Sequence, residues 1–279
     1  MEETQEVEFQ TQSIKTENTL FAEPVFNFHN FSITNSLLNT WLVVIIVLIF
    51  GLFIKSRIKL VPRGIQNAAE AVVEMLLGVF DSVTDSRQKT LKYFPFVLSF
   101  LVFILLNNWL GLLPGVGSIG QVASEHGEKI FIPFFRGGTA DLNTTLALAI
   151  VGVVASHIFS VAALGFWKYF NKFINLQALL EIPGKIWHEP TIIVVNPIKV
   201  FVGLIEVVGE FAKVASLSFR LFGNIFAGEV LLASMSALLA FGLPIPFMFL
   251  EIIIGLVQAF IFSILILAYV TMNTAKEEH

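Results

Sequence analysis

Charged side chains lie within a mostly apolar stretch of this sequence, between positions 206 and 229. They are Glu206, Glu210, Lys213, Arg220 and Glu229. Because an α-helix turns about 100° per residue, all of them except Glu229 share with Asn224 a stripe roughly 80° wide. A charged side chain deep in lipid costs on the order of 2.5 kcal/mol or more. We therefore expect this stripe to face protein, water or a partner, and to be a functional site.

Arg220 lies between carboxylates along the helix axis. Glu206 precedes it by fourteen residues, about 21 Å, and Glu229 follows it by nine, about 13 Å. A guanidinium stays protonated at any working pH, so Arg220 can attract a carboxylate and repel a proton but cannot relay one. This order predicts two proton-accessible regions separated by a fixed positive charge. The alternative is a buried structural ion pair of Arg220 with Glu206, Glu210 or Glu251.

Several motifs together resemble one family. The segment SLSFRLFGNIFAGE (216–229), followed by EIIIGLVQAFIFSILILAYV (251–270), is similar to the last two helices of subunit a of F-type ATP synthases. NNWLGLLPG (107–115) and DLNTTLALA (141–149) resemble earlier segments of that family in the same order. The resemblance implies a stator subunit, not catalytic alone, that couples proton translocation across the membrane to rotation of a c-ring.

The resemblance also implies roles for single residues. Arg220 would face the carboxyl group of each passing rotor subunit and act as a gate between two aqueous half-channels. Glu229 and Glu251 would lie on the external route. At the position of Glu251 this sequence departs from well-known bacterial relatives, which have His there, so the titrating group differs.

The cytoplasmic route would contain Glu206, with Glu210 as a further candidate. Asn224 and Gln258 are neutral hydrogen-bonding groups that would orient Arg220 or hold water beside it. The implied partners are the proteolipid subunits of the c-ring, the peripheral-stalk b subunits and the lipid bilayer. The implied ion is H⁺, with Na⁺ as the alternative.

The composition is that of a polytopic membrane protein. Of the 279 residues, 56% are hydrophobic and 14% are charged, and the mean hydropathy is +0.80. The net charge of −4 gives no sign of nucleic-acid binding. The absence of cysteine excludes disulfides, thiol chemistry and Cys-ligated metals. We predict neither a metal site nor a cofactor.

We expect an all-α integral membrane protein with about five membrane-embedded helices and one amphipathic helix on the membrane surface. A polar external tail at 1–36 would precede a single membrane domain at 37–279. The segment 37–54 has no charge and is followed by a basic cluster, which predicts the first span. Apolar residues at helical spacing between 62 and 92 predict the amphipathic helix.

Two further spans are expected at 95–113 and 142–164. Near the end of the first, Asn107 and Asn108 are interpreted as groups that hydrogen-bond between helices rather than as ligands. Within the second, His157 is interpreted as a hydrogen-bonded packing residue, with a proton relay as the alternative.

Two connections are expected between these spans and the end of the chain. The first is a loop at 114–140, in which His126 lies close to Glu125 and Glu128. We interpret the three as solvated side chains rather than as a metal site. The second is a polar connector at 165–191.

The pair Asn196-Pro197 predicts the start of a helix that nothing in the sequence ends before residue 241. Such a helix would be about 67 Å long, whereas the hydrocarbon layer is about 30 Å thick. It must therefore tilt steeply or break, with Gly209, Gly223 and Gly228 as the weakest points. A return helix at 247–270 would complete a long, tilted hairpin at about 197–271.

Orientation follows from the basic residues outside the membrane. With an external N-terminus, twelve Lys and Arg lie on the cytoplasmic side and three on the outer side. We therefore predict an external N-terminus and a cytoplasmic C-terminus. No cleavable signal is evident, and a bacterial plasma membrane is the expected location.

Two other classes of protein stay open as alternatives. A standalone secondary transporter or ion channel would use the same intramembrane charges on its substrate. It would be expected to contain an internal repeat, which we do not find in the sequence. A membrane enzyme acting on lipid or prenyl substrates would need an Asp-rich or His/Glu metal motif, but the intramembrane stretches contain no Asp and one His.

Overall fold

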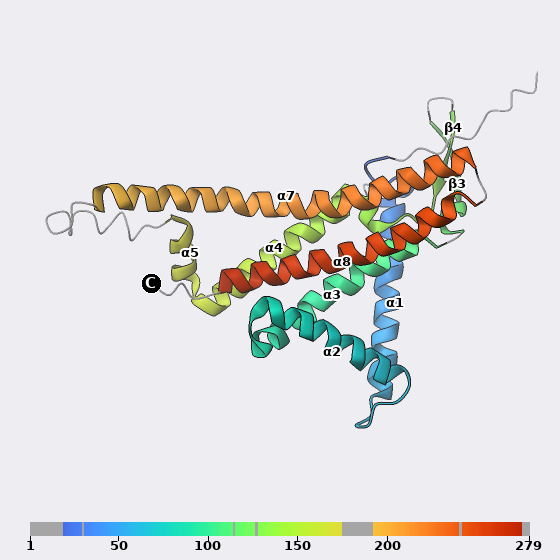
Figure 1. The fold of residues 1–279 in the computed structure, drawn as a ribbon. Coiled ribbons are helices and arrows are strands. Elements are labelled where there is room, and N and C mark those ends of the chain that lie inside the picture. Colours follow the sequence, from blue (N-terminus) through green and yellow to red (C-terminus); the bar gives the residue numbers. More distant parts are fainter. Residues whose placement is uncertain are drawn as a thin grey trace, which may run out of the picture.

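The computed structural model describes residues 19–29, 31–113, 115–125, 128–174, 192–239 and 242–274. This part of the chain forms long helices and two small β-hairpins (Figure 1). The helices are α1 (Asn35–Arg57), α2 (Ile65–Thr84), α3 (Arg87–Gly111), α4 (Leu142–Leu164), α5 (Phe166–Ile174), α7 (Ile192–Leu238) and α8 (Pro244–Thr274). Among these described helices, four are long and apolar enough to cross a membrane, namely α1, α3, α4 and α8. The predicted all-α membrane fold is confirmed.

The two hairpins are linked to each other beside the start of α1. Their strands are β1 (Pro24–Phe28) with β2 (Phe31–Thr34), and β3 (Gly120–Glu125) with β4 (Glu128–Pro133). The Gln121 side chain donates a hydrogen bond to the carbonyl of Val25, with an N to O distance of 3.0 Å. Thr34 caps α1 by accepting a hydrogen bond from the backbone N–H of Leu37 at 3.3 Å. The expected tail and the expected loop therefore each contain a hairpin.

Helix α2 is amphipathic, as predicted. Its buried side chains are Leu76, Leu77, Phe80 and Thr84, and the helix packs against α3 and α8. Its more polar side carries Glu74 and Asp81, which both pair with Arg87 at the start of α3, at 2.9 and 2.8 Å. The partial burial of α2 is typical of a helix that lies on a surface rather than crossing a membrane.

Helix α8 occupies the centre of the molecule and packs against α2, α3, α4 and α7. Small residues allow close helix contacts, as is usual in membrane proteins. A Cβ on Gly152 of α4 would lie 2.3 Å from the Cδ1 atom of Ile266, which is fully buried. Glycine at residue 152 therefore leaves the space that the Ile266 side chain occupies between α4 and α8.

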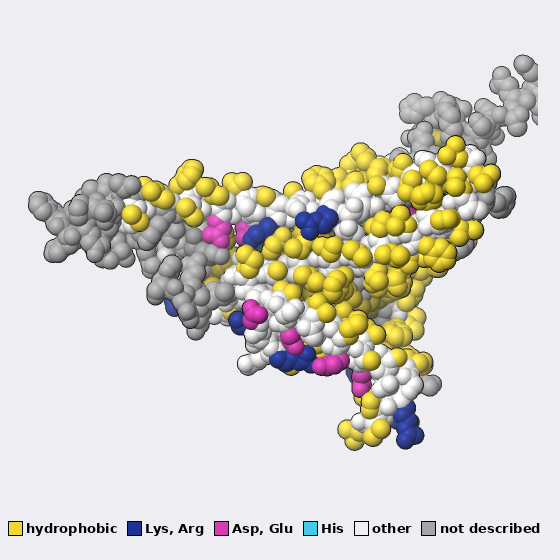
Figure 2. Space-filling model, in the orientation of Figure 1, with side chains coloured by type: hydrophobic (Ala, Val, Ile, Leu, Met, Phe, Trp, Pro, Cys, Tyr) yellow, Lys and Arg dark blue, Asp and Glu magenta, His cyan; other side chains and the backbone are white. Residues whose placement is uncertain are grey.

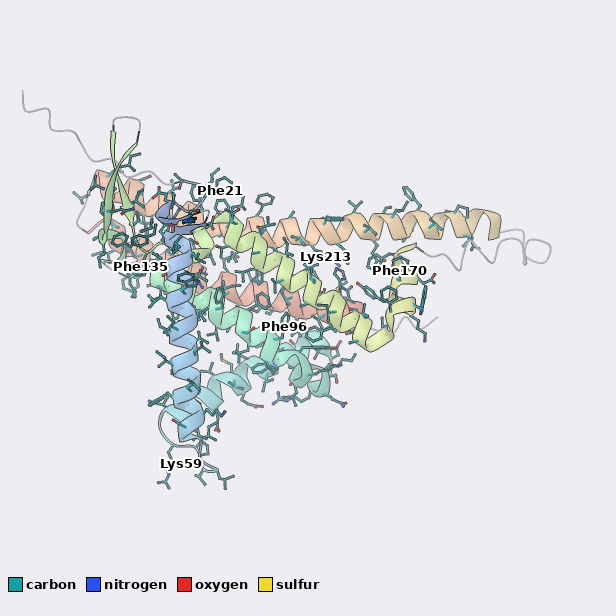
Figure 3. The ribbon with its side chains drawn as sticks, turned by 180° about the vertical axis from the view of Figure 1, so that it is seen from behind. Phe21, Lys59, Phe96, Phe135, Phe170 and Lys213 are labelled. Carbon is teal, nitrogen blue, oxygen red and sulfur yellow. The ribbon has the colours of Figure 1, made fainter. Side chains whose placement is uncertain are left out.

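Helices α7 and α8 run side by side and across the direction of α1 (Figure 1). Phe21 and Lys59 lie at opposite ends of α1 (Figure 3). With 47 residues, α7 is about 70 Å long, and it continues without a break through the three glycines named above. The sequence left two possibilities for this helix, a break or a steep tilt. Because α7 is unbroken, a bilayer about 30 Å thick requires the steep tilt.

The helix bounds differ from several of the predicted ones, most of all at the starts of α3 and α7, and one helix was not predicted. The second span begins at Arg87 rather than Pro95, because the polar first turns of α3 continue the helix outward, with Pro95 inside it. The long helix begins at Ile192 rather than Pro197. A proline removes one backbone donor, which membrane helices tolerate where neighbours satisfy the freed carbonyl. The expected connector after Gly165 contains α5, which packs beside α4 and α7.

Candidate functional site

The packing of α7 decides where Arg220 points. Leu217 and Leu221 are each 1% exposed and lie in the hydrophobic core. The hydroxyl of Ser218 lies 3.3 Å from that of Thr145 on α4, so this side of the helix is fixed against its neighbours. Arg220 lies roughly 100° from Leu221 around the helix, and its side chain is exposed.

Nη2 of Arg220 donates a hydrogen bond of 3.4 Å to the hydroxyl of Ser216, one turn earlier on α7. Arg220 forms no ion pair with any carboxylate in the described part of the chain. The alternative interpretation of Arg220 as a buried structural ion pair is therefore wrong. Figure 2 shows basic side chains in the middle of α7, with hydrophobic side chains along the helix on either side.

The helix surface around Arg220 is made of small residues. Ala212, Ser216, Gly223 and Ala227 are all exposed. A Cβ on Gly223 would have no other atom within 4 Å, so packing inside this chain does not require glycine there. The surface leaves space for another helix to approach closely.

Glu229 forms an ion pair with Arg136, a residue that the sequence did not single out as part of a site. Oε2 of Glu229 lies 2.9 Å from Nη2 and 3.0 Å from Nε of Arg136. The same guanidinium donates from Nη2 to the carbonyl of Thr19 at 2.9 Å and from Nη1 to the carbonyl of Phe21 at 3.4 Å. Arg136 therefore connects α7 to the segment before β1.

Glu251 lies beside Glu229, where α8 packs against α7. Its side chain is buried, and its Oε2 atom accepts no hydrogen bond from the described residues. A Cβ on Gly228 would lie 2.5 Å from Oε1 of Glu251. Glycine at 228 therefore makes the space that the Glu251 carboxyl group occupies.

The amide pair of α3 lies in the same region and links helices, which confirms its predicted role. Asn108 donates from Nδ2 to the carbonyl of Gly255 on α8 at 3.0 Å and accepts a hydrogen bond from Thr139. Asn107 accepts a hydrogen bond from the Asn39 amide on α1 at 3.3 Å. The Asn108 bond fixes α8 to α3 one turn after Glu251, and the Asn107 bond joins α3 to α1.

The other two predicted amides lie on less buried surfaces. Asn224 is exposed and Gln258 is half-buried. Neither side chain makes a hydrogen bond to another described residue, so both can bind water or a partner.

On the other side of Arg220 along α7, Glu206 is half-buried and Glu210 takes part in a cluster. Oε1 of Glu210 lies 2.7 Å from Nζ of Lys213, and Oε2 lies 3.5 Å from Nε2 of His157. His157 also hydrogen-bonds through Nδ1 to the hydroxyl of Tyr169 on α5. The interpretation of His157 as a hydrogen-bonded residue is confirmed, and the contact with Glu210 keeps the proton-relay alternative open.

Tyr169 lies outside the apolar spans and was not recognised in the sequence. Burial raises the pKa of its hydroxyl, and the carboxylates of Glu210 and Glu206 raise it further. The hydroxyl is therefore protonated at any working pH and can donate a hydrogen bond.

The described residues contain no group of three or more His, Cys, Asp or Glu side chains that could hold a metal ion. His126 lies outside the described residues, and the side chains of Glu125 and Glu128 are also not described. The interpretation of these three residues therefore stays a prediction.

A protein-family model described as ATP synthase A chain matches residues 37–271 of this sequence. The chain belongs to the ATP synthase A chain family. The matched region includes the stripe of α7, the whole of α8 up to residue 271 and every predicted site residue. The resemblance drawn from the motifs is confirmed.

Similar proteins of this family are named ATP synthase subunit a. The protein of Syntrophobacter fumaroxidans is 32% identical over 248 residues, which cover 88% of this chain and 87% of the relative. That of Campylobacter jejuni subsp. doylei is 33% identical, with 85% and 88% covered. That of Trichlorobacter lovleyi is 30% identical, with 88% and 89% covered.

Membership of the ATP synthase A chain family, together with the apolar helices, makes this chain a multi-pass membrane protein. It confirms the expected involvement in ATP synthesis and proton transport. The relatives are components of a complex rather than enzymes that act alone.

Proposed function

We propose that this chain is the stator ion-channel subunit of a rotary ATP synthase, in which an arginine gate between two aqueous half-channels couples proton translocation to rotation of a c-ring. The exposed guanidinium of Arg220 is the observation that supports this best. It lies on the outward surface of a long apolar hairpin without a carboxylate partner among the described residues. An intramembrane cation requires a counter-charge or water, and a rotor carboxylate supplies one.

The gate works through the charge state of that rotor carboxylate. Facing lipid, the group must be neutral, whereas facing Arg220 it can be charged. Opposite charges at short range in a medium of low dielectric constant favour the ionised form. Each rotor group therefore releases its proton as it approaches Arg220 and takes up another as it leaves. The membrane potential contributes about 2.3 kcal/mol per charge per 100 mV to this cycle.

The two half-channels lie on either side of Arg220 along the hairpin of α7 and α8. Glu229 and Glu251 form the external route, near the turn between α7 and α8. Glu206 and Glu210 form the cytoplasmic route, near α5. Because Arg220 lies between the two pairs, a proton can pass from one route to the other only on a rotor carboxyl group.

Asn224 lies about one turn beyond Arg220 on α7, where it would hold water or orient the guanidinium. Gln258 on α8 would do the same. Both assignments are supported by side chains that make no hydrogen bond to other described residues. The orientation that fits this arrangement has the N-terminus outside and the C-terminus in the cytoplasm.

The proposed partners are the c-ring proteolipids, which would contact the small residues around Arg220, and the peripheral-stalk b subunits. The ion is H⁺, with Na⁺ as the alternative, because the binding carboxyl group belongs to the ring.

Cysteine cross-linking tests the contact with the ring, since this chain has no cysteine of its own. We expect Gly223→Cys to cross-link to a ring proteolipid that carries a cysteine beside its membrane-embedded carboxyl group. Val72→Cys, on the exposed side of α2, is the matched control and should not cross-link. Equal cross-linking of both variants, or of neither in an assembled complex, would contradict the proposal.

A further inference from the structure

Three titratable side chains from three helices meet beside the first half of α7. His157 comes from α4, Tyr169 from α5 and Glu210 from α7. The imidazole contacts the other two through opposite nitrogens, Nδ1 toward the Tyr169 hydroxyl and Nε2 toward the Glu210 carboxylate. A ring bonded in this way can take a proton on one side and give one on the other.

The carboxylate of Glu210 has one oxygen free to receive that proton. Oε1 is paired with Lys213 at 2.7 Å, and the Lys213 ammonium also lies over the ring of Tyr269, 5.1 Å from its centroid. Oε2 is buried and makes no hydrogen bond to the described residues, with Nε2 of His157 at 3.5 Å. A buried carboxylate oxygen without a hydrogen bond is costly unless something delivers a proton to it.

The other end of the cluster reaches the surface through α5. Tyr169 is 8% exposed, whereas its helix neighbours Phe166 and Phe170 are 60% and 46% exposed. Figure 3 shows Phe170 on α5, close to the early part of α7. The Tyr169 hydroxyl therefore belongs to the buried side of a helix whose other side is exposed.

We propose that Tyr169 and His157 relay protons between water at α5 and Glu210, an inference that rests on the proposed function because it extends the cytoplasmic route. In the direction of Glu210, a hydronium ion gives a proton to the Tyr169 oxygen and becomes water, while the hydroxyl proton of Tyr169 moves to Nδ1 of His157. Nε2 of His157 then gives its proton to Oε2 of Glu210. Tyr169 and His157 end neutral, the imidazole changes tautomer, and Glu210 is the one side chain of the three whose charge changes. The reverse sequence returns a proton to water.

The test uses the whole complex in inverted membrane vesicles and measures ATP-driven acidification per assembled complex. Tyr169→Phe keeps the ring and removes the hydroxyl, so we expect the rate to fall at least about tenfold. Tyr93→Phe removes the same hydroxyl from another buried tyrosine, on α3, and should stay within about twofold of the unmodified complex. Equal rates for the two variants would overturn the relay.

A double variant separates a relay from a packing role. If Tyr169 acts through Glu210, Tyr169→Phe combined with Glu210→Gln is no slower than Glu210→Gln alone, because both changes interrupt one route. If the fold-reduction in pumping rate of the double variant equals the product of the two single reductions, Tyr169 acts independently of Glu210, which overturns the relay. Failure of the proposed function would give a different result from failure of the relay. If the proposed function is wrong, Arg220→Ala leaves pumping intact.

Discussion

Nη2 of Arg136 lies 2.9 Å from Oε2 of Glu229, and this ion pair joins the segment after β4 to the middle of the second half of α7. The side chains are 10% and 21% exposed. The same guanidinium also donates from Nη2 to the backbone carbonyl of Thr19 and from Nη1 to that of Phe21. One arginine therefore positions both the segment before β1 and a carboxylate of the proposed external route.

Arg136→Gln should reduce the amount of assembled complex. Removing one partner of a largely buried ion pair leaves an uncompensated charge, at a cost of about 3 kcal/mol. Adding Glu229→Gln removes that charge, so the double variant should assemble better than Arg136→Gln alone. The measurement is the yield of purified complex per membrane protein. A double variant that assembles less well than Arg136→Gln would show that the pair does not act as a unit.

Glu229→Gln should slow passive proton entry from the external side by about tenfold or more, because the amide cannot bind and release a proton. The measurement is proton flux through the assembled complex under an imposed potential. Glu74→Gln, which changes an exposed carboxylate on α2, is the control and should leave the flux unchanged. An unchanged flux in Glu229→Gln would remove this residue from the pathway.

Gly228→Ala should disturb the position of Glu251, since the added Cβ would lie 2.5 Å from its Oε1 atom. We expect a clear loss of ATP-driven pumping, and partial recovery when Glu251→Asp shortens the acid by one methylene. Gly78→Ala on α2, where a Cβ meets nothing within 4 Å, is the matched control. Pumping at the unmodified rate in Gly228→Ala would mean that Glu251 need not occupy this space.

Asp81 makes the attachment of α2 depend on pH. The neighbouring Thr90 hydroxyl and the Arg87 guanidinium lower the pKa of the Asp81 carboxyl group below its ordinary value of 3.8. A lowered pKa in the folded state stabilises the protein above the unfolded pKa, and this stabilisation is lost as the pH falls through the folded pKa. The difference in thermal midpoint between the unmodified chain and Asp81→Asn should be constant above about pH 5 and shrink below pH 3.8. A difference that grows on acidification would contradict this assignment.

Capping and turn residues allow the exact bounds of some helices to be predicted from the sequence. Helix α4 has the bounds expected from the sequence, because Asp141 caps its start by accepting from the N–H of Asn143. At its end, Gly165 has a φ of 86°, a conformation that few other residues adopt. The charged stripe of α7 was also readable, because helical periodicity fixes which residues share a face.

Contacts between distant segments could not be read in the same way. Arg136 and Glu229 are 93 residues apart, and nothing in the sequence distinguishes Arg136 from other basic residues outside the spans. Tyr169 lies in a segment with too few residues for a helical pattern to stand out. Its role depends on how α5 folds back onto α4 and α7, which is a tertiary contact rather than a local preference.

The gate at Arg220 is the central claim, and Arg220→Ala tests it most directly. In membrane vesicles that contain the assembled complex, ATP-driven proton pumping is measured beside the amount of complex, with Arg63→Ala as the control at an exposed arginine. The account predicts normal assembly and no coupled pumping in Arg220→Ala, and near-normal pumping in Arg63→Ala. Coupled pumping that survives in Arg220→Ala would contradict the account.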